Sequence, residues 1–288
     1  MKLGFIGTGV MGKSLVHHLL KDNHEVFIYT RTAAKAESLV EAGAVLLASP
    51  KEIAREASVI FTMVGYPSDV EEVYFGEGGL LENASESAIL VDLTTSKPHL
   101  AQRIYEAAAK KGIRTLDAPV SGGDIGAQTG LLSIMVGGDE GTFLEVQPLL
   151  ALFGGNVVHQ GAAGAGQHTK MCNQLNIASN MIGVCESLIY AQKAGLDPET
   201  VLRSISSGAA GSWSLSNLAP KMISEDFQPG FYIKHFIKDM KIALEESEAW
   251  GLELPGLKLS LKMYEELAAQ GFEDNGTQTL IKYYQSAQ

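Results

Sequence analysis

A glycine-rich segment directly after the first apolar stretch constrains the fold of this 288-residue chain more than any other feature. Lys2–Ile6 has the character of a buried strand, and Gly-x-Gly-x-x-Gly follows it at Gly7–Gly12, before a helical pattern. This order is typical of a dinucleotide-binding βαβ unit, in which the glycines allow a tight turn and close approach of a pyrophosphate. The N–H groups at the start of the helix then bind the phosphates. An ordinary glycine-rich turn is the less favoured alternative. The residues predicted to bind cofactor here are Gly7, Thr8, Gly9, Val10, Met11 and Gly12.

The end of the second predicted strand, Glu25–Thr30, bears on the choice of dinucleotide. In NAD-binding units this position usually holds Asp or Glu, which accepts hydrogen bonds from the ribose hydroxyls. Here the chain reads Thr30-Arg31-Thr32. A guanidinium can bind a 2′-phosphate with two parallel hydrogen bonds, and the hydroxyls can donate further ones. The sequence therefore favours NADP over NAD, which stays possible, with an ordinary surface arginine as the alternative.

Up to about residue 160, short β-rich runs alternate with helical patterns. The predicted strands are Lys2–Ile6, Glu25–Thr30, Ala44–Leu47, Ser58–Val64, Ala88–Asp92, Gly112–Asp117, Leu131–Val136 and Asn156–His159. The helical segments between most of them include Met11–Lys21, Ala33–Ala42, Pro50–Ala57, Pro98–Lys111 and Glu140–Leu150. Such alternation predicts a largely parallel sheet covered on both faces. We expect an α/β class fold that begins with a Rossmann doubly wound domain over residues 1–162.

After Gly166 the strand patterns stop, and a long helix is expected at about 166–194. It would join the first domain to an all-helical domain over residues 163–288. Asp197-Pro198-Glu199 resembles an N-cap, a first-position proline and a first-turn acid, which together open another helix. Further helices are predicted at about 214–224, 234–250, 256–270 and 276–285.

Composition excludes several classes of function. The net charge is −11 and no basic stripe is visible, which argues against nucleic-acid binding. No run is apolar enough to span a bilayer, and no signal peptide is apparent, so we expect a cytoplasmic protein without membrane contact. Cys172 and Cys185 fall on one predicted helix, about 20 Å apart, which is too far for a disulfide. Histidines and cysteines lack metal-ligand spacing, so no metal is expected.

A second cluster, Asp117-Ala-Pro-Val-Ser-Gly-Gly123, follows a predicted strand. The Ser121 hydroxyl and the N–H groups of Gly122 and Gly123 could bind a small carboxylate. An ordinary glycine-rich strand end explains this cluster equally well.

A third cluster opens the long helix, and it contains Lys170 in the second turn. Asn173 and Gln174 follow at i+3 and i+4 on the same face. Lys170 is the sole Lys, Arg, Asp or Glu between Glu145 and Glu186. A lysine held by amides near a cofactor can have a lowered pKa and act as a proton donor. We favour this catalytic interpretation over a solvated surface lysine.

Together the three clusters resemble the β-hydroxyacid dehydrogenases, a family that includes 3-hydroxyisobutyrate dehydrogenase, tartronate semialdehyde reductase and the glyoxylate/succinic semialdehyde reductases. The motifs are Gly-Phe-Ile-Gly-Thr-Gly-Val-Met-Gly at 4–12, Asp-Ala-Pro-Val-Ser-Gly-Gly at 117–123 and Gly-x-Gly-x-x-x-Lys-x-x-Asn-Gln at 164–174. They occur in the family's order over essentially the whole chain. 6-Phosphogluconate dehydrogenase is a more distant relative.

The resemblance implies roles for residues that the motifs alone do not assign. Lys170 would be the general acid/base, and Ser121, Gly122 and Gly123 would bind the substrate carboxylate. Either Asn173 or Gln174 would contact the substrate, because the family often has Asn four residues after the lysine, where this chain has Gln. The resemblance also assigns the cofactor contacts Met63, Val64, Gly65, Thr95 and Lys238, and the substrate-side residues Phe231 and Asp239.

We therefore expect an NADP-dependent oxidoreductase that transfers hydride between the nicotinamide and a small hydroxyacid or semialdehyde. Hydroxyisobutyrate, tartronate semialdehyde, glyoxylate and succinic semialdehyde all stay open as substrates. The alternatives are an imine reductase and a non-catalytic NADP-binding interaction protein. The resemblance and the apolar helical domain indicate a homodimer or homotetramer. Trp213 is interpreted as a pocket wall or as a buried anchor between helices.

Overall fold

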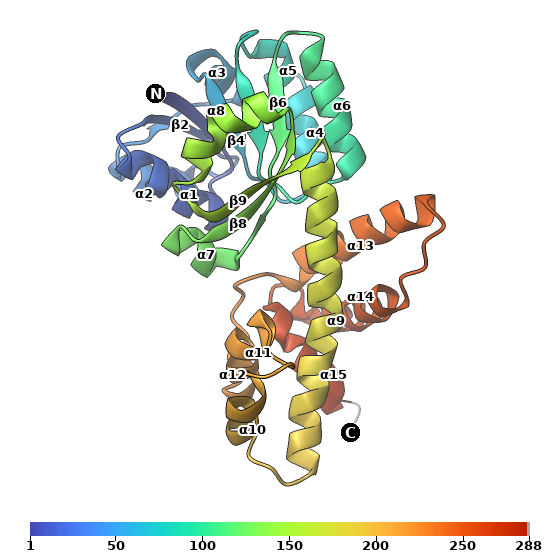
Figure 1. Cartoon of the computed structure of the whole chain (residues 1–288). Helices are drawn as coiled ribbons and strands as arrows, with labels where there is room; N and C mark the ends of the chain where they lie inside the picture. The colour runs from blue at the N-terminus through green and yellow to red at the C-terminus, as the bar shows by residue number, and fades with distance from the viewer. Residues whose placement is uncertain (287–288) are drawn as a thin grey trace. The chain divides into compact units, whose positions relative to one another are not determined.

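The computed structural model describes residues 1–286. The chain divides into two compact units, the first covering Met1–Lys170 and the second beginning at Met171. One long helix, α9 (Ala165–Lys193), carries the chain from the first unit into the second (Figure 1). The expected long helix is thus present, and its first six residues belong to the first unit.

A nine-stranded sheet forms the centre of the first unit. The strand order is β3-β2-β1-β4-β5-β6-β8-β7, and β9 pairs with β8. The first six strands in this order are parallel, and β8 runs antiparallel to β6 and β7. The strands are β1 (Lys2–Ile6), β2 (Glu25–Tyr29), β3 (Val45–Leu46), β4 (Val59–Thr62), β5 (Ile89–Asp92), β6 (Arg114–Asp117), β7 (Val120–Ser121), β8 (Leu132–Gly138) and β9 (Gly154–Gly161). The order 3-2-1-4-5-6 is that of a Rossmann fold, so the predicted class is confirmed.

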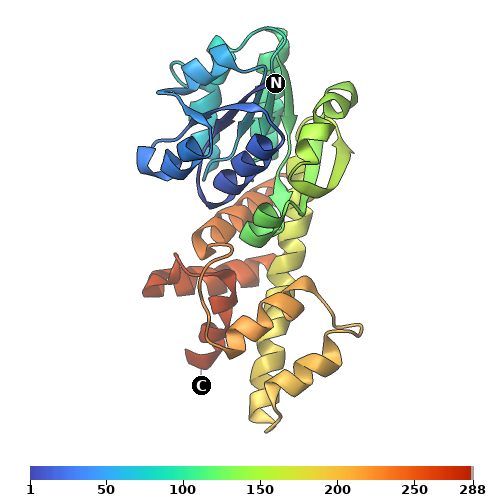
Figure 2. The same ribbon diagram turned by 90° about the vertical axis from the view of Figure 1, so that its left-hand side faces the viewer.

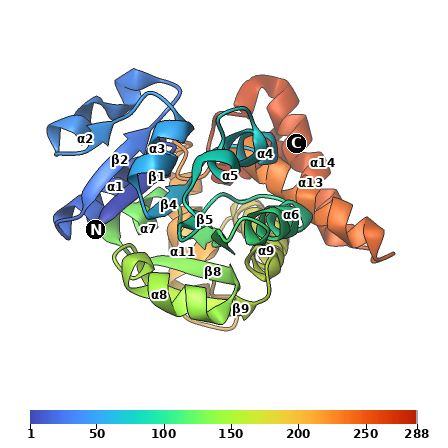
Figure 3. The same ribbon diagram turned by 90° about the horizontal axis from the view of Figure 1, so that it is seen from above.

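Side chains alternate along these strands between two separate cores, because successive residues of a strand point to opposite faces. In β1, Leu3 and Phe5 enter one core and Ile6 enters the other. Helices α1 (Val10–Lys21), α2 (Glu37–Glu41), α7 (Gly123–Thr129) and α8 (Glu140–Leu150) cover the first face. Helices α3 (Pro50–Glu56), α4 (Pro67–Phe75), α5 (Leu80–Asn83) and α6 (Pro98–Ala109) cover the second (Figure 3). The sheet is therefore covered on both sides, as expected.

Helices around α9 make up the second unit, and their apolar side chains share one core (Figure 2). They are α10 (Pro198–Ile205), α11 (Trp213–Asn217), α12 (Ala219–Ile223), α13 (Ile233–Ala249), α14 (Pro255–Leu267) and α15 (Ile281–Ser286). The helix expected at 214–224 is two helices instead. Pro220 has no N–H to continue α11, so α11 ends before it. Proline is favoured in the first turn of a helix, and α12 begins there, after Leu218. Among the described residues of this unit, strand-like pairing is limited to a single bridge, Tyr232 with Gly276.

The two cysteines lie on α9 as free thiols, Cys172 exposed and Cys185 buried. Within residues 1–286, no helix is both long and apolar enough to cross a membrane.

Candidate functional site

The first glycine-rich loop has the shape that a dinucleotide requires. Gly7 has φ of +100°, and a Cβ there would lie 2.1 Å from the Met63 carbonyl oxygen. A Cβ at Gly12 would lie 2.0 Å from the Gly7 carbonyl oxygen, so α1 packs tightly on β1. At Gly9, by contrast, a Cβ would meet nothing within 4 Å, which leaves open space beside the first turn of α1. Close packing therefore requires glycine at positions 7 and 12, and the positive φ requires it at position 7 as well, whereas packing within the protein places no such demand on Gly9.

The rest of this loop offers polar groups that the protein itself does not use. The buried Thr8 hydroxyl has no hydrogen-bond partner among the described residues. Val10 is exposed and Met11 partly buried at the start of α1, and no side chain caps that helix. These residues fit a bound pyrophosphate, because orphan N–H groups at a helix N-terminus bind anions.

Thr30, Arg31 and Thr32 follow β2, as predicted, next to this loop. Arg31 is 68% exposed and forms an ion pair with Asp69 at 2.9 Å between Nη1 and Oδ1. The other carboxylate oxygen of Asp69 accepts a hydrogen bond from the Tyr66 N–H, which starts α4. Arg31 therefore lies over the C-terminal edge of the parallel strands, but an acid already pairs with it.

The loops after β4 and β5 are joined to each other. Met63, Val64 and Gly65 follow β4 and are partly exposed, as is Thr95 after β5. The Thr94 hydroxyl accepts a hydrogen bond from the Val64 N–H at 3.0 Å. The Thr94 N–H in turn donates to Asp92 Oδ1 at 3.0 Å. These two loops, both predicted to contact cofactor, thus form one hydrogen-bonded group.

The loop predicted to bind a carboxylate contains the short strand β7, which sequence patterns did not reveal. Ser121 ends this strand and is partly exposed. Gly122 and Gly123 both have positive φ, +131° and +62°, a conformation that favours glycine. A Cβ at Gly122 would also lie 3.1 Å from Leu132 Cδ2.

Lys170 is buried, with 6% of its surface exposed, in the second turn of α9. The surface-lysine interpretation is therefore wrong. Lysine is rarely buried so completely, because its charge is costly to remove from water.

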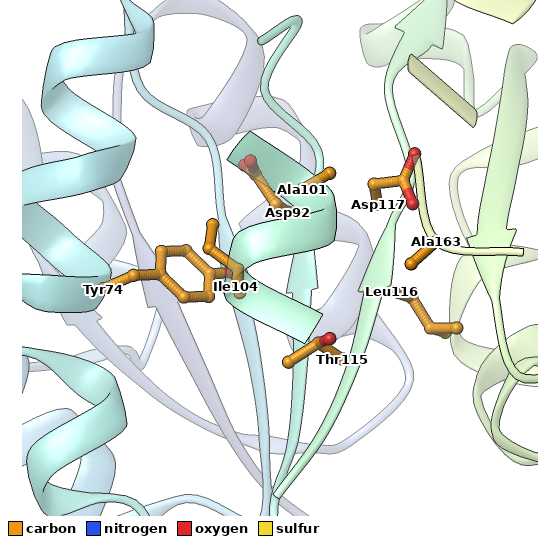
Figure 4. Close-up of a pocket in the computed structure, with 8 residues that line it drawn as sticks. All are labelled: Tyr74, Asp92, Ala101, Ile104, Thr115, Leu116, Asp117 and Ala163. Atoms are coloured by element: carbon orange, nitrogen blue, oxygen red, sulfur yellow. The ribbon is translucent and has the colours of Figure 1, made fainter. Parts of the chain in front are cut away.

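Asp117, at the end of β6, fixes the start of α9. Its carboxylate accepts hydrogen bonds from the Gly164 and Gln167 N–H groups, both at 2.8 Å. Burial raises the pKa of Asp117, while these N–H donors act in the opposite direction. Asp92, its register partner on β5, lines the same small cavity of about 10 Å³, about the size of one water molecule (Figure 4). The buried Tyr74 also lines this cavity, and burial together with Asp92 raises its pKa.

In the second unit, a chain of polar contacts connects four of the predicted residues. Asn173 Nδ2 donates to Gln174 Oε1, and Gln174 Nε2 donates to Asp239 Oδ2, both at 2.6 Å. Asp239 Oδ1 pairs with Lys238 Nζ at 2.9 Å. Gln174 and Asp239 are each 1% exposed, whereas Asn173 is only partly buried. Asp239 is therefore buried within this ion pair, whereas 12% of the Lys238 side chain is exposed.

The aromatic candidates of the second unit differ in exposure. Phe231 is partly buried against Phe236, with ring centroids 5.6 Å apart. Trp213 is 57% exposed, so the buried-anchor interpretation is wrong.

Asp117 and Gln167 are the polar residues that sequence reasoning did not single out as site residues. Asp117 could have been identified from the sequence, because it is an acid at the end of an apolar strand, and a buried acid requires hydrogen-bond partners.

Two family models match the chain. One, for the NAD-binding domain of 6-phosphogluconate dehydrogenase, matches residues 2–161. The other, described as the NAD-binding part of NADP-dependent 3-hydroxyisobutyrate dehydrogenase, matches residues 164–284.

Full-length relatives and solved structures agree with these models. The uncharacterized oxidoreductase YkwC of Bacillus subtilis (strain 168) is 61% identical over 98% of each chain. The 2-hydroxy-3-oxopropionate reductase of Escherichia coli (strain K12) is 38% identical, over 94% of this chain and 92% of the relative. The structure of Mycobacterium tuberculosis 3-hydroxyisobutyrate dehydrogenase with L-serine has a TM-score of 0.89 at 29% identity, over 98% of both chains.

Proposed function

The chain belongs to the 3-hydroxyisobutyrate dehydrogenase family of NAD(P)-binding oxidoreductases, and we propose that Lys170 is its general acid/base in hydride transfer to and from a small hydroxyacid. The observation that carries the proposal is the burial of Lys170, at 6% exposure, in the second turn of α9. Burying a cationic side chain costs free energy, and such burial is found mainly at functional sites. NADP(H), when bound, supplies or accepts the hydride.

The proposed substrate is a small acid with a hydroxyl, or in its oxidised form a carbonyl, near the carboxylate. Ser121 and the N–H groups of Gly122 and Gly123 would hold the carboxylate and so fix the orientation of the reacting carbon. During reduction, Lys170 Nζ would donate a proton to the carbonyl oxygen. During oxidation, it would remove the proton from the hydroxyl. The names of the relatives, 3-hydroxyisobutyrate dehydrogenase and 2-hydroxy-3-oxopropionate reductase, support this substrate class.

Of the two amides after Lys170, Asn173 is the one proposed to contact the substrate. Both ends of the Gln174 amide are already hydrogen-bonded within the protein, to Asn173 and to Asp239. Gln174 would therefore orient Asn173, and Asn173 would stabilise charge that develops on the substrate oxygen. Phe231 and Asp239 belong to the substrate side of this proposal.

NADP is the proposed cofactor, with Thr30, Arg31 and Thr32 around the 2′-phosphate. Gly7–Gly12 would hold the pyrophosphate, and the open space at Gly9 supports this assignment. The remaining proposed cofactor contacts are Met63, Val64, Gly65, Thr95 and Lys238. We further propose a cytoplasmic homodimer or homotetramer.

The proposal is tested by measuring turnover of a panel of substrates by the wild type and by Lys170→Ala. The panel contains small semialdehydes, hydroxyacids and a cyclic imine, and turnover is followed by the absorbance of NADPH. We expect turnover of an acid substrate, with kcat lowered about 10²–10⁴-fold in Lys170→Ala, which is the range for losing a general acid/base. NADPH affinity should hardly change.

Lys193→Ala is the matched control, because it removes an exposed lysine from the last turn of the same helix. It should retain wild-type kcat. Near wild-type kcat in Lys170→Ala would remove Lys170 from the mechanism. Turnover of the imine alone would favour an imine reductase, and NADPH binding without any turnover would favour a non-catalytic NADP-binding protein.

A further inference from the structure

We propose that Gln167 is a positioning residue, which sets Lys170 against the loops predicted to hold the cofactor. The inference rests on the proposed function, because it assumes that Lys170 moves a proton. Gln167 lies three residues before Lys170, so the two side chains share one face of α9. Gln167 itself would not touch the substrate.

The side chain of Gln167 is completely buried and uses both ends of its amide. Its Oε1 accepts a hydrogen bond from the Ser96 N–H at 2.9 Å. Its Nε2 donates to the Thr94 carbonyl at 2.7 Å. The amide thus bridges the backbone on both sides of Thr95, a predicted cofactor contact.

The same loop is fixed from its other side. Thr94 accepts from the Val64 N–H and donates its own N–H to Asp92. A single hydrogen-bonded network therefore runs from the Met63–Gly65 loop through Thr94 to Gln167 on α9. Any shift of Gln167 would change the position of Lys170 relative to the Met63–Gly65 loop and the loop around Thr94.

The helix that carries Gln167 has little freedom to slide. Asp117 accepts hydrogen bonds from the N–H groups of Gly164 and Gln167. A Cβ at Gly166 would lie 2.4 Å from the Met135 carbonyl oxygen and 2.6 Å from that of Asp117. The first turn of α9 is thus seated directly on the backbone of β6 and β8, and Gln167 adds the connection to the loop after β5.

The chemistry requires a group that donates at one end and accepts at the other. Leucine has similar size and can do neither. An ionised glutamate could accept from Ser96, but it would face the Thr94 carbonyl with a second negative oxygen. A protonated glutamate can make both hydrogen bonds. Because burial raises the pKa of a carboxyl group, protonation at this position is within experimental reach.

The experiment compares Gln167→Leu and Gln167→Glu in the full-length protein. We expect kcat to fall about 10²-fold in Gln167→Leu, the scale for a misplaced catalytic group, with the Kd for NADPH changed less than about threefold. In Gln167→Glu, the ratio of kcat to that of the wild type should rise as the pH falls and the carboxyl group becomes neutral. A role in stability alone would lower Tm in both variants but leave kcat of the folded enzyme unchanged at every pH.

Hydrogen exchange provides a readout that is independent of turnover. The Ser96 amide should exchange faster in Gln167→Leu than in the wild type without any cofactor present, because its acceptor is gone. Gln192→Glu, an exposed glutamine near the end of α9, is the matched control and should change neither exchange nor kcat.

The outcomes separate the two proposals. If Lys170→Ala loses activity but Gln167→Leu retains wild-type kcat, or if Ser96 exchange is unchanged, the positioning role is overturned and the proposed function stands. If Lys170→Ala retains wild-type kcat, the proposed function fails, and this inference fails with it.

Discussion

The close seating of α9 on the sheet can be tested by stability alone, with the substitution Gly166→Ala. The new Cβ would lie 2.4 Å from the Met135 carbonyl oxygen, 2.6 Å from the Asp117 carbonyl oxygen and 2.8 Å from Asp117 Oδ2. Two of these are backbone atoms in neighbouring strands, so they cannot rotate away. Forcing an extra carbon into such a packed place costs about 1–3 kcal/mol or more.

Gly183→Ala provides the matched control in the same helix. A Cβ at Gly183 meets nothing within 4 Å, and the residue is exposed. Replacing glycine by alanine inside a helix stabilises by about 0.5–1 kcal/mol. Because both variants change the unfolded chain in the same way, that contribution cancels when they are compared. The free energies of unfolding of the two variants should therefore differ by the packing cost alone, about 1–3 kcal/mol or more.

Urea unfolding followed by far-ultraviolet circular dichroism measures this difference. Gly183→Ala should have the same or a higher midpoint than the wild type, and Gly166→Ala a clearly lower one, with unchanged slopes. Equal midpoints for the two variants would refute the reasoning, since the close approach of α9 to β6 and β8 would then make no contribution to the free energy of unfolding.

Three further predictions concern charge, thiol reactivity and pH. Arg31→Asp should raise the KM for NADPH roughly 10- to 100-fold and improve the use of NADH, because charge-assisted hydrogen bonds to the 2′-phosphate contribute about 1.5–3 kcal/mol; an unchanged ratio of the two cofactors would contradict the assignment. In the native protein, a thiol reagent such as DTNB should modify the exposed Cys172 and spare Cys185, whose thiol pKa is raised by burial, until the chain is unfolded; rapid labelling of both would be the opposite result. Burial, and to a lesser degree Lys238, lower the pKa of His235, so the unfolded chain takes up its proton first as the pH falls below about 6.5 and the native state loses stability there. His235→Asn should therefore flatten the decline of Tm between about pH 6.5 and pH 5, and an identical slope would count against a depressed pKa.

Sequence patterns predicted the strands and the long helix well, because most of these elements are long or strongly apolar and glycines, prolines or polar residues separate them. All eight predicted strands exist, and their ends differ from the observed ones by at most two residues. The strand β7 was not predicted, since Val120 and Ser121 lie between Pro119 and two glycines, which favour a turn, and only pairing with β8 makes them a strand. Helix α7 was also missed. It contains Gly123 and Gly126, which have low helix propensity, and its packing against α1 and β8 supports it instead.

The site shows the same division between local and long-range information. The glycines at positions 7, 9 and 12 could be interpreted locally, because a turn and a helix start depend on neighbouring residues. The hydrogen bond from Gln174 to Asp239 could not, since Asp239 lies sixty-five residues further along the chain. Likewise, no local pattern connects Gln167 with Thr94 and Ser96. These contacts require the parallel sheet to bring separate strand ends together.

Placing an acid/base on α9 makes its position depend on the first helical turn. Lys170 follows Gly166 by four residues, about 6 Å along the axis, so a displacement of the first turn reaches Lys170 almost undiminished. Helices hold side chains more rigidly than loops do, but the position of the whole helix still depends on the residues against which it packs. On this argument Gly166→Ala should lower kcat beyond its effect on stability, whereas Gly183→Ala, thirteen residues past Lys170, should leave kcat unchanged. Equal kcat in both variants would mean that α9 does not transmit the displacement, and that Gln167 with its loop holds Lys170 in place by itself.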